Sequence, residues 1–312
     1  MAERRTVAVL GTGTIGASWA ALFLAHGLRV RAWDPAPDAG DRLAASIERA
    51  WPALDRLGTA ADADRSAWSF HADPAETVQG AFFVQENAPE RLEVKRELLQ
   101  RLADTLGEDA ILASSSSGLL PSDIQAGAPF AARVVVGHPF NPPHLIPLVE
   151  VVGGRETAPA TVEAAMAFYR SVGRRPIRLN KEVPGHLVNR LQAALWREAV
   201  DAVATGLASV EDIDAGIAFG PGLRWALMGP HLTFHLAGGE KGMPGFMEHF
   251  LPGMERWWAD MRQPALTDAL KADLIAGVEA EAAGRTPREL AAERDRRLIL
   301  LLETLRQPET GT

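Results

Sequence analysis

A glycine-rich turn near the N-terminus constrains the fold of this chain more than any other feature. Residues 11–16 read GTGTIG, a GxGxxG pattern that directly follows the apolar run 6–11 (TVAVLG) and opens a helical stretch. Asp34 ends the next strand-like run, LRVRAWD. A strand, a glycine-rich turn, a helix and a second strand that ends in an acidic residue are typical of a dinucleotide-binding βαβ unit.

Each position of the turn has a physical reason. Gly11 permits the tight turn, and Gly13 lets the backbone approach a pyrophosphate, while Gly16 allows close packing of helix on strand. Thr14 and Ile15 open the helix, whose unpaired N–H groups can bind phosphate oxygens. We therefore expect these five residues to bind the cofactor. A purely structural glycine turn is the alternative.

Asp34 favours NAD over NADP. Its carboxylate can accept hydrogen bonds from the adenosine ribose hydroxyls and would repel a 2′-phosphate. The next residues, Pro35 and Ala36, supply no cation, and Arg42 lies a turn or two further on. We expect NAD as the cofactor.

Strand-like runs alternate with helical stretches through the first half of the chain. Further runs of this kind cover residues 80–87, 110–117, 133–140 and 148–154. Strands separated by helices imply right-handed crossovers and a mostly parallel sheet. After about Arg178 no strand signal of comparable quality follows. We predict an α/β chain: a Rossmann-type, doubly wound sheet over residues 1–182, followed by an all-helical domain over residues 183–312.

Helix-boundary signals divide the second half. Pro184 lies near the expected start of one helix and Gly206 just beyond its end. Capping-box-like segments begin at Ser209 (SVED) and at Thr286 (TPRE). Apolar residues recur at helical spacing in the first of these helices, which predicts a packed face; they are Leu187, Leu191, Ala194 and Leu195.

Composition excludes several classes of function. The 312 residues contain no cysteine, which excludes disulfides, thiolate metal sites and a cysteine nucleophile. The net charge of −8 argues against general binding to nucleic acid or to an anionic membrane. No apolar run reaches about 18 residues, and the first strand begins too early for a signal peptide. We expect a cytoplasmic protein whose partner is a small molecule.

A buried acid and a nearby histidine suggest general-base chemistry. Glu150 lies within the apolar strand LVEVVGG, which we expect to be covered on both faces, so its charge needs a partner. His138 ends the preceding strand, and the proline-rich link HPFNPPHLIP can bring the two together. A carboxylate on one ring nitrogen would leave the other to take a proton from a substrate hydroxyl, while NAD takes the hydride. A structural bond at the sheet edge is the alternative.

Five segments resemble the 3-hydroxyacyl-CoA dehydrogenase superfamily, in that family's order and spacing over nearly the whole chain. They are VAVLGTGTIG, QENAPERLEVKREL, ILASSSSGL, GHPFNPPHLIPLVEVV and KEVPGHLVNRLQ. The resemblance implies that His138 is the general base and that Glu150 orients it. It also implies that Ser117 contacts the substrate oxygen, that Asn189 completes the site, and that Glu86 lies near the nicotinamide.

The serine run around Ser117 follows a strand's C-terminal end, where open α/β sheets bind ligands. For Ser114 and Ser116 we expect only a solvated turn. Ser115 stands where the family often has asparagine. For Asn189 a helix cap or a solvent-facing position is the alternative.

The helical half departs from the acyl-CoA members. Residues 220–230 read GPGLRWALMGP, which resembles the branch containing carnitine 3-dehydrogenase and gulonate 3-dehydrogenase, the lambda-crystallin relatives. Members of that branch act on free 3-hydroxy acids. Arg224 could bind a carboxylate through two parallel hydrogen bonds, or it could form a surface salt bridge. Trp225 could line the substrate pocket or bind a quaternary ammonium group, with core or subunit packing as the alternative; the same holds for Phe234, Trp257 and Trp258.

We therefore expect an NAD-dependent dehydrogenase of a small free 3-hydroxy acid that forms a homodimer through its helical domain, as family members do. The alternatives are a dehydrogenase of short-chain L-3-hydroxyacyl-CoA such as 3-hydroxybutyryl-CoA, a non-catalytic crystallin-like protein that binds NAD, and a dehydrogenase with Lys181 as its catalytic residue. His231 and His235 have i, i+4 spacing without an acidic residue between them, so we expect no metal site.

Overall fold

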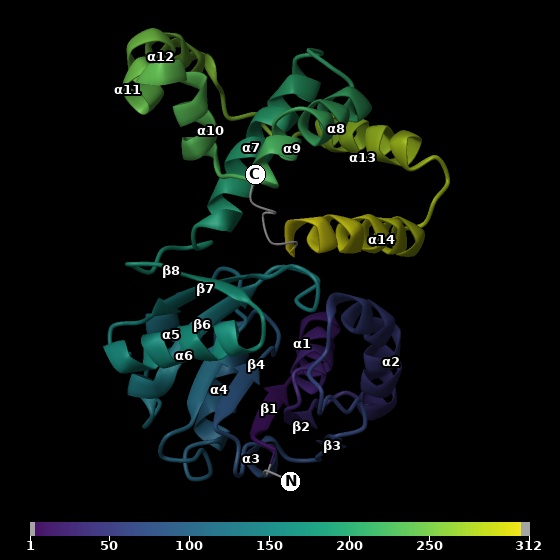
Figure 1. Cartoon of the computed structure of the whole chain (residues 1–312), viewed down its shortest axis with the longest axis vertical. Helices are drawn as coiled ribbons and strands as arrows, with labels where there is room; N and C mark the ends of the chain where they lie inside the picture. Colours follow the sequence, from purple (N-terminus) through teal and green to yellow (C-terminus); the bar gives the residue numbers. More distant parts are fainter. Residues whose placement is uncertain (1–3, 307–312) are drawn as a thin grey trace. The chain divides into compact units, whose positions relative to one another are not determined.

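The computed structural model describes residues 4–306, which form two compact units that divide after Arg190 (Figure 1). The first unit contains a sheet covered by helices, and the described elements of the second are helical. This confirms the predicted α/β sheet followed by a helical domain. No described helix is long and apolar enough to cross a membrane.

Eight strands build the sheet of the first unit. They are β1 (Thr6–Leu10), β2 (Arg29–Trp33), β3 (Trp68–Phe70), β4 (Phe83–Glu86), β5 (Ile111–Ser114), β6 (Val134–Pro139), β7 (Leu148–Gly153) and β8 (Arg175–Arg178). Their order is β3-β2-β1-β4-β5-β6-β7-β8. All neighbours are parallel except β6 and β7, which confirms the mostly parallel sheet.

The central strands are apolar on both faces because helices cover both faces. The helices of this unit are α1 (Thr14–Ala25), α2 (Ala39–Leu57), α3 (Pro74–Thr77), α4 (Leu92–Arg101), α5 (Pro121–Gln125) and α6 (Pro159–Ser171). In β1, Val7 and Val9 pack into one core with residues of α1, α2 and α6. Ala8 and Leu10 point the other way and pack with residues of α4 and α5. The alternation is that of a doubly wound sheet.

The topology gathers several strand ends at one place. The order reverses at β1, which pairs with β2 on one side and with β4 on the other. Leu10 is the register partner of Glu86, which is in turn the partner of Ser114. The C-terminal ends of β1, β4 and β5 therefore lie side by side at the switch point, where open α/β sheets bind ligands.

The helices of the second half are α7 (Val188–Ala204), α8 (Val210–Phe219), α9 (Pro221–Trp225), α10 (Pro230–Ala237), α11 (Gly242–His249), α12 (Leu251–Asp260), α13 (Asp268–Ala282) and α14 (Pro287–Arg306). Ser209 caps α8 by accepting a bond from the Asp212 amide. Thr286 and Glu289 form a reciprocal capping box at α14. Both predicted helix starts are confirmed.

The predicted start of α7 near Pro184 is wrong. Gly185 and His186 have φ values of 75° and 53°, so the backbone is left-handed there and the helix begins only at Val188. The apolar face predicted to be packed is also exposed: Leu187, Leu191 and Leu195 are 45%, 55% and 40% accessible.

Candidate active site

The glycines of the first turn are required by the fold to different degrees. Gly11 has φ +83°, and a Cβ there would lie 2.7 Å from the Asn87 carbonyl oxygen. At Gly16 a Cβ would lie 1.8 Å from the carbonyl oxygen of Gly11. A Cβ at Gly13 would meet no atom within 4 Å. The turn therefore requires glycine at positions 11 and 16, whereas the absence of a side chain at Gly13 leaves open space next to the turn.

This open space has the properties of a dinucleotide site. Gly13 is the N-cap of α1 and supplies no side-chain cap, so the first N–H groups of this helix are available to phosphate oxygens. The buried hydroxyl of Thr12 has no hydrogen-bond partner among the described residues. Asp34 accepts hydrogen bonds from the backbone amides of Thr12 (2.7 Å) and Ala36 (2.9 Å), so it lies beside the turn at the end of β2. The residues present fit NAD, and the contacts of Asp34 with the ribose stay a prediction.

The predicted histidine and glutamate meet in the sheet. His138 of β6 and Glu150 of β7 are direct register partners in the antiparallel pair. The Nδ1 atom of His138 lies 2.8 Å from Oε2 of Glu150, and the two side chains are 7% and 0% exposed. Because the ionised carboxylate can only accept, Nδ1 carries the proton and Nε2 presents its lone pair. That arrangement suits a general base.

The second oxygen of Glu150 is also satisfied. Its Oε1 accepts hydrogen bonds from the backbone amides of Leu187 and Val188, each at 2.9 Å. Burial alone would raise the pKa of Glu150, but the bonds from His138 and these two amides outweigh burial and hold the pKa below its ordinary value. Glu150 is therefore an ionised, fully bonded support for His138.

His186 was not identified from the sequence. It is completely buried, its Nε2 lies 3.0 Å from the carbonyl oxygen of Ser116, and its ring centroid is 5.4 Å from that of His138. Burial lowers its pKa, so the ring is neutral, and the carbonyl partner places the proton on Nε2. The only sequence signal was a histidine inside the GHLVNRL segment. Its placement depends on the left-handed turn that sequence reasoning missed.

The structure brings Asn189 and Ser117 together. Nδ2 of Asn189 donates to the backbone carbonyl of Ser117 at 3.0 Å. Asn189 is the second residue of α7, and Ser117 is exposed just beyond β5. With His186 bonded to the adjacent Ser116, both predicted polar residues lie in the same neighbourhood as the dyad.

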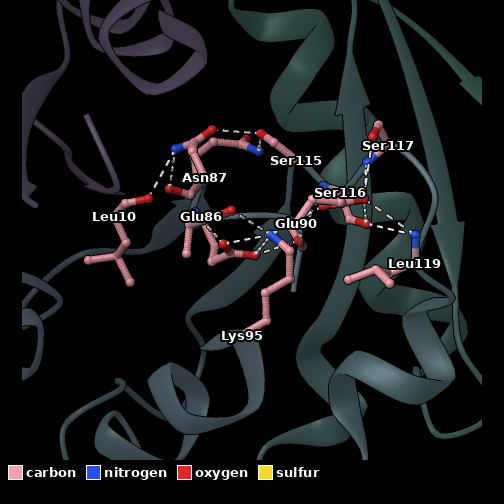
Figure 2. Close-up of polar contacts among 12 residues, drawn as sticks. Leu10, Glu86, Asn87, Glu90, Lys95, Ser115, Ser116, Ser117 and Leu119 are labelled. Atoms are coloured by element: carbon pink, nitrogen blue, oxygen red, sulfur yellow. Dashed lines mark hydrogen bonds and ion pairs between the residues drawn. The ribbon is translucent and has the colours of Figure 1, made fainter. Parts of the chain in front are cut away.

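Glu86 lies at the end of β4, completely buried (Figure 2). Both its oxygens contact Nζ of Lys95, at 2.9 and 3.0 Å, and the Ser114 hydroxyl and Ala88 amide also donate to it at 2.5 Å each. Lys95, which sequence reasoning missed, is itself only 1% exposed. Proximity of Glu86 to the nicotinamide stays a prediction.

The expectation of a solvated turn at Ser114 and Ser116 is wrong. Both residues are 0% exposed, and their hydroxyls donate to Glu86 and Glu90 respectively. Ser115 donates to Oδ1 of Asn87 at 2.7 Å, which links the ends of β4 and β5 (Figure 2). The residues next to Ser114 and Ser116 in the sequence do not indicate this burial, because the carboxylates that accept from the two hydroxyls belong to β4 and to the loop after it.

The predicted specificity residues belong to the helical unit. Arg224 is exposed on α9, and its guanidinium forms no salt bridge within residues 4–306. Trp225 is 41% exposed, and Trp257 and Trp258 are also exposed. The ring of Phe234 stacks on that of Phe246, with the ring centroids 4.7 Å apart. Contact of these residues with a substrate stays a prediction.

The residues proposed for other chemistry have different positions. Lys181 is exposed, just before the left-handed turn. His235 accepts a hydrogen bond from the Met243 backbone amide, which is a structural contact within the helical unit.

Comparison with known families gives a match over both halves of the chain. Residues 6–183 match the NAD-binding domain of 3-hydroxyacyl-CoA dehydrogenase, and residues 185–272 match the C-terminal domain of the same family. The predicted domain boundary after residue 182 lies next to the junction of the two matches.

Individual relatives extend over nearly the whole chain. An L-carnitine dehydrogenase of Streptomyces griseus is 52% identical, covering 98% of this chain and 92% of its own. One from Pseudomonas putida is 45% identical, covering 99% and 96%. The crystal structure of 5-formyl-3-hydroxy-2-methylpyridine 4-carboxylic acid 5-dehydrogenase has a TM-score of 0.84 at 31% identity, covering 98% and 100%.

A more distant structure shows the same architecture. Escherichia coli 3-hydroxybutyryl-CoA dehydrogenase has a TM-score of 0.64 at 31% identity, covering 80% of this chain and 53% of its own. The glycine-rich turn, the buried histidine and glutamate pair and the two family matches agree. The chain belongs to the 3-hydroxyacyl-CoA dehydrogenase family and is an NAD-dependent oxidoreductase that acts on a CH–OH group.

Proposed function

We propose that this protein oxidises the 3-hydroxyl group of L-carnitine to the 3-oxo compound with NAD. The observation that carries the proposal is the buried pair of His138 and Glu150 in a chain that is 45–52% identical to L-carnitine dehydrogenases. Structures named for 3-hydroxybutyryl-CoA are more distant, at 26–31% identity. The thioester alternative is therefore not favoured.

The arrangement of the dyad supports proton removal from the substrate hydroxyl. Nε2 of His138 accepts the hydroxyl proton, and Glu150 stabilises the imidazolium that results without taking the proton itself. Bound NAD supplies the acceptor for the hydride from the same carbon. Ser117 and Asn189 orient the reacting oxygen, Ser117 through its hydroxyl and Asn189 through the bond that holds the Ser117 carbonyl.

Recognition of carnitine needs a cation for its carboxylate and an apolar or aromatic surface for its trimethylammonium group. Arg224 is suited to the carboxylate because its guanidinium has no salt-bridge partner among the described residues. Trp225 follows it directly and can bind the trimethylammonium group through its ring face. The net charge of −8 gives no long-range attraction to polyanionic CoA, which also favours a small free acid.

Initial rates with NAD test the substrate. We expect turnover of L-carnitine, and much slower turnover of gulonate and of 3-hydroxybutyryl-CoA. His138→Gln should lose activity by about 10²- to 10⁴-fold, the range for loss of a general base. Faster turnover of the thioester, or full activity of His138→Gln, would contradict the proposal.

Substitution of Arg224 tests the carboxylate contact separately. Arg224→Leu should raise KM for L-carnitine by about 10- to 100-fold, the effect of losing a charged hydrogen-bonding partner. KM for a thioester should change little. Arg288→Leu, another exposed arginine of the helical half, is the matched control and should leave both values unchanged. An equal effect on acid and thioester would exclude this role.

A further inference from the structure

The segment that carries Ser117 has an unusual set of hydrogen bonds. Residues 115–119, which we call the serine loop, follow β5. Three of its donors converge on one atom, Oε1 of Glu90: the Ser116 hydroxyl at 2.7 Å and the amides of Ser117 and Gly118 at 2.8 and 2.9 Å (Figure 2). The Ser117 hydroxyl at 3.3 Å and the Leu119 amide at 3.4 Å also reach this atom, and the Leu119 amide lies closer to the Ser116 hydroxyl oxygen, at 3.0 Å.

The carbonyl oxygens of the serine loop are held by different residues. His186 bonds to the Ser116 carbonyl, and Asn189 donates to the Ser117 carbonyl, each at 3.0 Å. The loop is therefore fixed through its donors by Glu90 and through its acceptors by the segment that also supports Glu150. These two sets of bonds act on Ser117 and its direct neighbours, whereas Ser115 is bonded separately to Asn87.

Glu90 can accept so many bonds because it is ionised. Burial would raise its pKa, but the Ser116 hydroxyl, the nearby charge of Lys95 and the loop amides outweigh burial and lower the pKa. Its second oxygen, Oε2, lies 3.7 Å from Nζ of Lys95, a buried cation that also binds Glu86. Hydrogen bonds to a charged acceptor are stronger than neutral ones, so the loop is held firmly.

The amide and the hydroxyl of Ser117 form hydrogen bonds of different length with Oε1 of Glu90. The amide is held at 2.8 Å, whereas the hydroxyl lies at 3.3 Å, a long and weak contact. The hydroxyl can therefore leave Glu90 for a substrate oxygen while the amide keeps the residue in place.

We propose that Glu90 is a positioning residue: its carboxylate holds the serine loop so that the Ser117 hydroxyl meets the substrate oxygen beside His138. The kinetic part of this proposal rests on the proposed dehydrogenase function. The structural part, that Glu90 orders residues 116–119, does not depend on the substrate.

Amide hydrogen exchange tests the structural part. Glu90→Ala should speed exchange of peptides covering residues 116–119 by about 10-fold or more, because the amides of Ser117 and Gly118 lose their acceptor. The Leu119 amide would keep its bond to the Ser116 hydroxyl oxygen. Glu97→Gln, an exposed carboxylate of the neighbouring helix α4, is the matched control and should exchange like the wild type. Unchanged exchange in Glu90→Ala would overturn the proposal.

Kinetics test whether Glu90 acts through Ser117. Glu90→Ala should lower kcat about 10- to 100-fold with little change in KM for NAD. Glu90→Gln should lose less, because its carbonyl can still accept from the loop although its NH₂ group then faces Lys95. If Glu90 works by positioning Ser117, Glu90→Ala should lower kcat much less in a Ser117→Ala background than in the wild type.

The outcomes are distinguishable. The kinetic role would be overturned if Glu90→Ala lowered kcat as much in the Ser117→Ala background as in the wild type. It would also be overturned if a rise in the NAD dissociation constant accounted for the whole loss of activity. If Glu90→Ala fails to fold, Glu90→Gln still tests the proposal. Thermal unfolding of each variant shows whether it is folded. A wild-type protein inactive on every 3-hydroxy acid would refute the proposed function, while the exchange measurement would still decide whether Glu90 orders the loop.

Discussion

At the scale of single residues, Glu150 shows how one carboxylate can serve both a fold and a reaction. One oxygen accepts from His138 and the other from the amides of Leu187 and Val188. The burial of Glu150 and its need for a partner followed from an apolar strand with one acid in it. The two amides could not be anticipated, because they depend on left-handed backbone at Gly185 and His186.

Glu150→Gln should inactivate the protein without unfolding it. The glutamine carbonyl can still accept from the amides of Leu187 and Val188, but its NH₂ group then donates to Nδ1 of His138. The proton moves to Nε2, the atom that must accept from the substrate, so kcat should fall by about 10²- to 10⁴-fold. Steady-state rates and circular dichroism check this. Retained activity, or loss of the folded signal, would contradict it.

The lowered pKa of Glu150 predicts an acid-sensitive contribution to stability. Its ionised form is favoured in the folded state, so the stabilisation is complete above about pH 4.3, the ordinary value for glutamate. It is lost as the pH falls through the lowered folded-state pKa. The thermal midpoint of the wild type should therefore fall more steeply than that of Glu150→Gln below about pH 4. Parallel curves between pH 7 and pH 3 would exclude this contribution.

At the scale of elements, the pairing of β6 with β7 builds the dyad. Antiparallel pairing places His138 opposite Glu150, with both side chains on one face of the sheet. The sequence was compatible with this pairing because a proline-rich link can fold back. The number of residues between His138 and Glu150 did not determine the register of β6 against β7. The short outer strands β3 and β8 were not predicted, because three or four residues carry little alternation.

The glycines at the start of α1 give a prediction for this element. Gly16→Ala should lower the thermal midpoint markedly, because its Cβ would lie 1.8 Å from a carbonyl oxygen. Gly13→Ala should leave the midpoint nearly unchanged, since its Cβ meets no atom within 4 Å. The same methyl group would occupy the space proposed for the pyrophosphate and weaken NAD binding. Thermal unfolding and fluorescence titration with NAD separate the two effects. Equal NAD affinity in Gly13→Ala and the wild type would contradict the placement of the phosphates.

At the scale of the whole molecule, the helical unit exposes many large apolar side chains. On α7 they include Leu191, Leu195 and Trp196, which are 55%, 40% and 59% exposed. We propose that a second copy covers part of this surface and that the protein is a homodimer, because extended apolar surfaces of this kind mark protein interfaces.

Sedimentation tests the homodimer. The wild type should sediment at about twice the chain mass of 33.5 kDa. Leu191→Glu combined with Leu195→Glu should weaken association, because burying two unpaired carboxylates is costly. Arg288→Glu, a change at an exposed residue of α14, is the control. A monomeric wild type at micromolar concentration would contradict the proposal.

The strands of the sheet other than β3 and β8, the cofactor turn, the helix caps at Ser209 and Thr286 and the pair of His138 and Glu150 were all accessible from the sequence. Each depends on local pattern: hydrophobic period, glycine spacing, capping residues and a charge inside an apolar run. The buried roles of Ser114, Ser116, Lys95 and His186 were not accessible in this way. Their partners lie on other strands and loops, so their burial and bonding depend on how the sheet brings distant segments together and removes water from between them.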